Sequence, residues 1–160
     1  MRDDIKSLFT DLQNRLNLKK ELLRLLLEKE ESVSNIIKTK YRDDTEDSIK
    51  KIIEYENDLI DEIKLADYNI SQIRDEITRK SGFDFDKIFI KNYKPPEVEI
   101  TDYKKEILLH EQIMGELIKI KKENNNHLEN YADDLKVQIR ELGSIERLRF
   151  VIKDLRASSR

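Results

Sequence analysis

Two pairs of residues could bind a metal ion, because in each a histidine follows a glutamate by four positions. The pairs are Glu106–His110 and Glu123–His127. On a helix, residues four apart lie on one face, where both side chains can reach the same ion. Neither pair has the Glu-x-x-His spacing or the additional carboxylates of metal-binding helical bundles. We therefore favour solvated pairs on a helix surface, and we expect no metal and no other cofactor.

Other groups for catalysis are scarce. The chain has 2 histidines and no cysteine, so catalytic triads and thiol chemistry have almost nothing to build on. No glycine-rich phosphate-binding motif is present. Glu56 lies among apolar positions, where an acidic residue more often fixes helix register or lies at a bundle edge than acts as a catalyst. We expect a protein that is not an enzyme.

The composition predicts long exposed helices. Charged residues make up 41% of the 160 positions, with 3 glycines and 2 prolines, and the net charge of −3 gives no indication of nucleic-acid binding. No run approaches the ~18 apolar residues that span a membrane, so no membrane insertion is expected. The first residues, MRDDIKSLF, contain no continuous apolar stretch, so no signal peptide is expected and the predicted location is the cytoplasm.

Two long helices are predicted over residues 1–42 and 45–81. In the second, alternate steps of three and four residues meet apolar side chains at every position but Glu56. Such heptad spacing over four repeats is typical of a helix packed in a bundle. The first is leucine-rich and keeps this spacing, with Lys19 and Glu30 at polar positions. Because the charged break between the helices is short, we expect an antiparallel hairpin.

Residues 82–101 interrupt this pattern and predict a connector with one short helical turn, which Asp84 could cap. Two consecutive prolines force an extended path within it. Connections of this length are uncommon unless they pack down or bind something. Its aromatic residues are expected either to cap one end of the bundle or to form a secondary contact with a partner or a second copy. These residues are Phe83, Phe85, Phe89 and Tyr93.

A third helical segment is predicted over residues 102–155, and its apolar stripe is more polar than that of the second helix. Its stretch KKENNNHLEN begins with seven residues that carry no apolar side chain. Steps of three and four residues nevertheless pass through this stretch and reach Leu128 and Leu135 without a change of phase. A loop would have no reason to preserve that phase, so we favour a continuous helix. A break at Asn124–Asn126 stays open as the alternative.

Together these elements predict an all-α fold. A long antiparallel helical hairpin and a long C-terminal helix would form an elongated three- to four-helix bundle of coiled-coil type. The whole of residues 1–160 is expected to be one domain.

Three stretches resemble a known family. The leucine- and glutamate-rich LKKELLRLLLEKEESV, the helix IIEYENDLIDEIKLADYNISQIRDEI with its central glutamate, and the asparagine-containing KKENNNHLEN are similar to those of FlgN-type flagellar type III export chaperones. The FliT-like filament-cap chaperones are near relatives of that family. The resemblance covers roughly residues 5–145.

The resemblance implies a cytoplasmic chaperone. Such proteins hold the amphipathic C-terminal helix of a hook–filament junction or filament-cap protein and deliver it to the export gate. The apolar stripe of the third helix is the expected partner-binding face, because a partner helix could complete a bundle there. Its residues are Leu128, Tyr131, Leu135, Ile139, Leu142, Leu148 and Ile152.

Two alternatives stay open. The same stripe could pack on the hairpin of its own chain, and the two arrangements could exchange. The chain could instead be a structural coiled-coil tether or assembly subunit whose helices pair with copies of themselves. A weak homodimer is compatible with the chaperone, whereas a strongly stable one would favour the tether.

Overall fold

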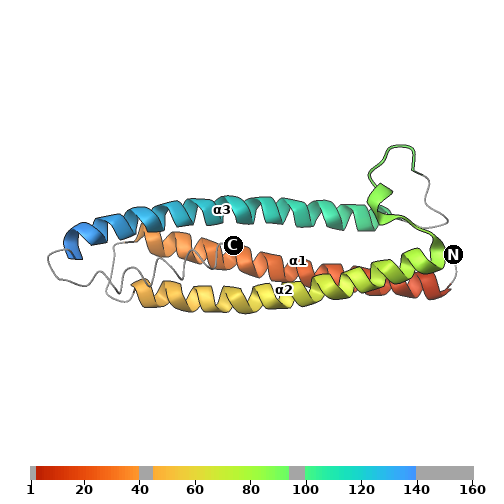
Figure 1. The fold of residues 1–160 in the computed structure, drawn as a ribbon, viewed down its shortest axis with the longest axis horizontal. Coiled ribbons are helices and arrows are strands. Elements are labelled where there is room, and N and C mark those ends of the chain that lie inside the picture. Colours follow the sequence, from red (N-terminus) through yellow and green to blue (C-terminus); the bar gives the residue numbers. More distant parts are fainter. Residues whose placement is uncertain (1–2, 40–44, 94–99, 140–160) are drawn as a thin grey trace. The chain divides into compact units, whose positions relative to one another are not determined.

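The computed structural model describes residues 3–39, 45–93 and 100–139, with residues 131–139 as helix backbone alone. Three long helices account for most of them: α1 (Asp3–Lys38), α2 (Thr45–Ser81) and α3 (Thr101–Ile139) (Figure 1). A short 3₁₀ helix, η1 (Phe85–Lys87), lies in the connector. No strand occurs in these ranges. The predicted all-α fold is confirmed.

The ends of the helices follow local chemistry. Helix α2 has the predicted bounds, with acidic residues in its first turn and basic residues in its last. It stops at Gly82, whose φ of 74° suits glycine and whose amide donates to the carbonyl of Thr78 over 2.8 Å. Helix α1 is shorter than predicted and ends at Lys38.

Helix α3 runs through the polar stretch without interruption. The favoured interpretation, a continuous helix, is therefore confirmed, and the break at Asn124–Asn126 does not occur. The remainder of the predicted third segment, residues 140–155, lies outside the described residues.

The chain divides into two compact units, and every long helix contributes to both. Unit 1 comprises residues 1–24 and 61–113, and unit 2 comprises residues 25–60 and 114–160. The prediction of a single domain stays a prediction.

In unit 1, α1 and α2 are antiparallel. Asp4 lies 3.6 Å from Lys80, and Lys19 lies 2.6 Å from Asp67. Residues from all three helices and the connector share one apolar core, as heptad spacing predicts. The buried members are Leu12, Leu16, Ile70, Ile77, Phe83, Ile88 and Tyr103.

The connector closes one part of this core with its aromatic rings. Phe83 is fully buried, with its ring centroid 4.6 Å from that of Phe85 and 6.1 Å from that of Tyr93. Asp84 caps η1, and its backbone amide donates to the Tyr93 hydroxyl over 2.8 Å. Phe89 differs from the other three, because 54% of it is exposed. Capping is thus observed for three of the four predicted aromatic residues.

In unit 2, α3 runs parallel to α1 and α2 runs antiparallel to it. Leu128 of α3 packs with Val33 of α1 and with Ile49 and Ile53 of α2. Beside this apolar cluster, the three helices bring polar side chains together in the interior.

Candidate partner-binding site

Five polar residues of unit 2, named here the polar layer, meet between the three helices. They are Glu30 and Ser34 from α1, Glu56 from α2, and Lys121 and Asn124 from α3. Glu30, Glu56 and Asn124 are buried, and Glu56 is only 1% exposed. In the sequence, all but Ser34 occupy positions that the three-four spacing of their helices otherwise gives to apolar side chains.

Asn124 is the centre of the hydrogen bonding in the polar layer. Its Nδ2 donates both to the backbone carbonyl and to Oε2 of Glu30, each over 2.8 Å. Its Oδ1 accepts from the Ser34 hydroxyl over 2.6 Å. A buried amide with both ends paired is well tolerated inside a bundle. These bonds explain why a helix can carry an asparagine on its inward face.

The charges of the polar layer are unequal. The Lys121 ammonium lies 3.7 Å from Glu30 Oε1 and 3.8 Å from Glu56 Oε2, so two carboxyl groups share one cation. These separations exceed hydrogen-bond length, and Glu56 Oε2 has no hydrogen-bond partner among the described residues. Burial first, and then the neighbouring Glu30 carboxyl, raise the pKa of Glu56 to about 8, although Lys121 acts to lower it. At neutral pH, Glu56 is therefore mostly protonated.

The polar layer interrupts the apolar contact of α3. Among the described side chains of residues 114–130, the buried ones are Leu117, Asn124 and Leu128. Lys121, with its side chain 18% exposed, occupies the remaining inward position. From Leu117 to Leu128, the inward face of α3 is therefore apolar at both ends and polar at the two positions between them.

A pocket of about 300 Å³ opens beside the polar layer, between the last turns of α1 and the polar stretch of α3. Glu123 and His127 line it and are exposed, as predicted for that pair. The remaining lining residues are Ser34, Ile37, Lys38, Asn124 and Asn130.

The structure places only part of the predicted partner-binding face. Leu128 is buried against α1 and α2 of its own chain. At this position the stripe therefore packs on its own hairpin, which is one of the two alternatives left open by the sequence. Tyr131, Leu135 and Ile139 continue its helix at steps of three, four and four, so they share its face by register. The other three positions, Leu142, Leu148 and Ile152, lie outside the described residues.

The other histidine pair lies in unit 1, and the prediction that it is solvated is wrong. His110 is 5% exposed, and its Nε2 lies 3.6 Å from Oε2 of Glu106. Neither of these two atoms has a hydrogen-bond partner among the described residues, whereas Glu106 Oε1 lies 3.0 Å from the Lys20 ammonium. Burial first, and then the charge of Lys19, lower the pKa of His110, so it is neutral at pH 7. Steps of three and four residues along the apolar positions of the third helix also reach His110. This spacing is the feature of the sequence that indicates an inward-facing His110 side chain.

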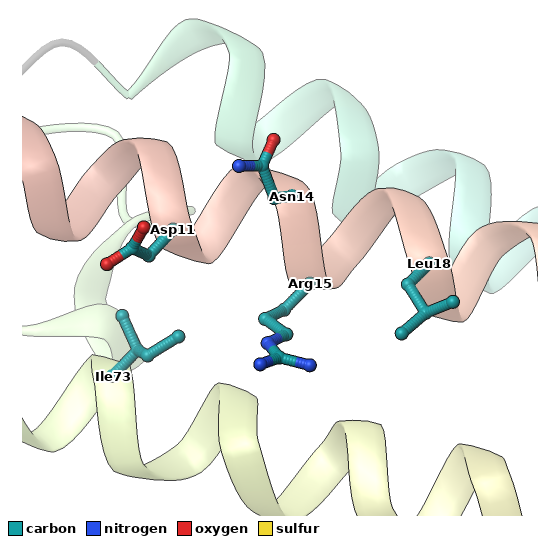
Figure 2. Close-up of a pocket in the computed structure, with 5 residues that line it drawn as sticks. All are labelled: Asp11, Asn14, Arg15, Leu18 and Ile73. Atoms are coloured by element: carbon teal, nitrogen blue, oxygen red, sulfur yellow. The ribbon is translucent and has the colours of Figure 1, made fainter.

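A second pocket, of about 400 Å³, lies between α1 and α2 of unit 1. Figure 2 shows its lining residues, Asp11, Asn14, Arg15 and Leu18 on α1 and Ile73 on α2. One guanidinium, one carboxylate, one amide and two aliphatic side chains favour no single class of ligand.

Comparison with models of protein families, with curated proteins and with solved structures found no match. Within the described ranges, no cluster of three or more histidine, aspartate or glutamate residues could hold a metal ion. No helix in those ranges is long and apolar enough to cross a membrane. The polar layer and the face of α3 that contains it are the strongest candidate for a functional site.

Proposed function

We propose that this chain is a non-enzymatic export chaperone that receives an amphipathic helix of a partner protein on the inward face of α3 in unit 2. The polar interruption of that face supports the proposal, because it limits the apolar contact that holds α3 to its own hairpin. Burial of apolar area is the main contribution to such packing, at about 25 cal/mol per Å². A helix held in this way can exchange its own hairpin for a partner.

The length of α3 also supports this proposal. Helix α3 continues for 11 residues past Leu128, whereas α1 continues for 5 past Val33. Helix α2, which runs the other way, begins 4 residues before Ile49. Leu128, Val33 and Ile49 pack together and so mark one level of the bundle. At 1.5 Å per residue, α3 extends about 16 Å beyond this level, and the described parts of α1 and α2 extend about 6–8 Å beyond it. The final turns of α3 thus lie beyond the described ends of the hairpin helices.

The nature of the partner comes from the family resemblance. The proposed client is a hook–filament junction or filament-cap protein, bound through its C-terminal amphipathic helix in the cytoplasm and delivered to the export gate. Its helix would pack on the inward face of α3, across the polar layer and along the stripe that begins at Leu128. A weak homodimer of the chaperone is compatible with this role, and nucleic acid and membrane insertion have no part in it.

Purified hook–filament junction protein provides the test. Leu135→Glu combined with Leu142→Glu places two charges in the proposed stripe and is expected to abolish capture of the client in a pull-down assay. The matched control is Leu65→Glu with Tyr68→Glu, which changes two residues on α2 that are 61% and 62% exposed. The control should capture the client normally, and circular dichroism should show unchanged helix content in both proteins. Capture by the Leu135/Leu142 variant at the level of the control would reject the proposal.

The same proteins test the alternative role as a coiled-coil tether. Leu65 and Tyr68 lie one turn apart on the surface of α2 and would suit self-association of that helix. A dimer that persists on dilution and is lost in the Leu65/Tyr68 variant would favour the tether. Under the chaperone proposal, sedimentation should instead show a monomer or a weak dimer in both proteins.

A further inference from the structure

The two helix segments that cover α3 in unit 2 share one sequence pattern. In α1 it is Leu26, Glu30 and Val33, and in α2 it is Ile52, Glu56 and Leu59. Each consists of an apolar residue, a glutamate four positions later and an apolar residue three positions after that. Five of these six side chains are buried and Ile52 is half-buried. Both neighbours of α3 therefore present a carboxyl group from within an apolar stripe.

The face of α3 explains this shared pattern. Lys121 brings a cation to both carboxyl groups, and the Asn124 amide donates to one of them. A purely apolar helix on this face would take both carboxyl groups away from the Lys121 ammonium and would leave the Asn124 amide without the acceptors that it now has. An unpaired buried donor weakens an interface more than a lost apolar contact does, and removing the counter-charges of a partly buried cation weakens it further. This face of α3 therefore disfavours a partner helix that has no hydrogen-bond acceptor opposite Lys121 and Asn124.

We propose that the partner helix received on this face carries a carboxylate at a core position, in the pattern apolar-x₃-Glu/Asp-x₂-apolar, and that Lys121 and Asn124 select it. This inference rests on the proposed function and specifies its partner. When α3 exchanges its hairpin for the partner, the partner's carboxylate takes over the contacts that Glu30 and Glu56 now make. Apolar residues on either side would pack against Leu117 and Leu128. Specificity of this kind comes from penalising the wrong helix as much as from attracting the right one.

A peptide of residues 45–63 is a suitable probe, because it contains the α2 copy of the pattern. The full-length chain is titrated with this fluorescein-labelled peptide and with its Glu56→Leu and Glu56→Lys versions, and binding is followed by fluorescence anisotropy. Concentrations must reach the millimolar range, since the chain's own hairpin competes at an effective concentration of about that size. A Glu54→Leu version serves as the matched control, because Glu54 is exposed on the same helix.

The native and Glu54→Leu peptides are expected to bind at least tenfold more tightly than the two Glu56 versions. With a Lys121→Glu host, the order should reverse, so that the Glu56→Lys peptide binds best. The comparison of peptides on the native host is decisive by itself if the Lys121→Glu host fails to fold. Equal binding of all four peptides, or tighter binding of the Glu56→Leu peptide, would overturn the selection while leaving helix reception intact. Binding of no peptide would overturn both this inference and the proposed function.

Discussion

Replacing Glu56 by glutamine is expected to make the stability of the protein less sensitive to alkaline pH. Glu56 is buried beside Glu30, and the two share the single ammonium of Lys121. The pKa of Glu56 is about 8 in the folded chain, against an ordinary value of 4.5. Because the folded state holds this proton more tightly than the unfolded state, the stabilisation is fully present below pH 4.5 and is lost as the pH rises through 8.

The expected change is large relative to the stability of a typical domain. One pKa unit corresponds to about 1.36 kcal/mol, so ionisation of Glu56 should reduce the free energy of unfolding by roughly 3 kcal/mol between pH 5.5 and 8.5. Typical domains are stable by only about 5–15 kcal/mol. The Glu56→Gln side chain is neutral at every pH and can donate to Glu30 as the protonated acid does. By this linkage the variant should exceed the stability of the native protein by about 1.4 kcal/mol at pH 5.5 and by roughly 3 kcal/mol more at pH 8.5.

Urea denaturation followed by circular dichroism measures this difference. The native protein, Glu56→Gln and Glu54→Gln are unfolded at pH 5.5, 7.0 and 8.5, and the last serves as control because Glu54 is exposed on the same helix. The native and control curves should shift together to lower urea concentrations as pH rises, and the Glu56→Gln curve should shift less. If all three proteins lost stability in parallel, the polar layer would not be holding the proton on Glu56.

Three further predictions follow from the same structure. Asn124→Ala should reduce the free energy of unfolding by about 2–3 kcal/mol in urea denaturation, because the polar layer loses its central amide, whereas Asn126→Ala at an exposed position should have little effect. Phe83→Ala should cost about 3–5 kcal/mol and Phe89→Ala less than about 1 kcal/mol, since the first ring is fully buried and the second is exposed. The lowered pKa of His110 should make the native protein lose stability as pH falls below 6.5, and His110→Gln should lessen that loss in the same assay.

Local sequence signals were sufficient for the bounds of α2 and for the continuity of α3, but they placed the end of α1 beyond Lys38. The heptad spacing, the charged ends and Gly82 all indicated the same bounds for α2, and the structure has those bounds. The preserved phase through KKENNNHLEN likewise predicted the continuity of α3. Three consecutive asparagines disfavour a helix only through local propensity, and packing in a bundle readily outweighs that preference. Asn124 shows how, because its amide is fully paired with groups of α1.

The polar layer was harder to predict, because its members come from three helices. Periodicity showed that Glu30, Glu56, Lys121 and Asn124 each lay at an inward position of its own helix. It could not show that these positions lie at one level, since that depends on the register between helices. His110 shows how a local spacing can mislead. A spacing of four places Glu106 and His110 on one face of a helix without saying which face, whereas the three-four spacing of the apolar positions meets His110 and indicated the inward face, where it is buried.

Each unit buries a titratable side chain in its uncharged form at neutral pH, and the two respond to protons in opposite directions. In unit 1, acid would charge His110 near Lys19, whereas in unit 2, alkali would charge Glu56 beside Glu30. Both side chains are uncharged across a window that includes neutral pH and ends near pH 8, where Glu56 ionises, so neither unit buries these charges within that window. Alkali therefore weakens the hold of the hairpin on α3 without charging the core of unit 1. Under the proposed exchange, a partner carboxylate would replace Glu30 and Glu56 most readily at the alkaline end of this window, where Lys121 must neutralise two negative charges.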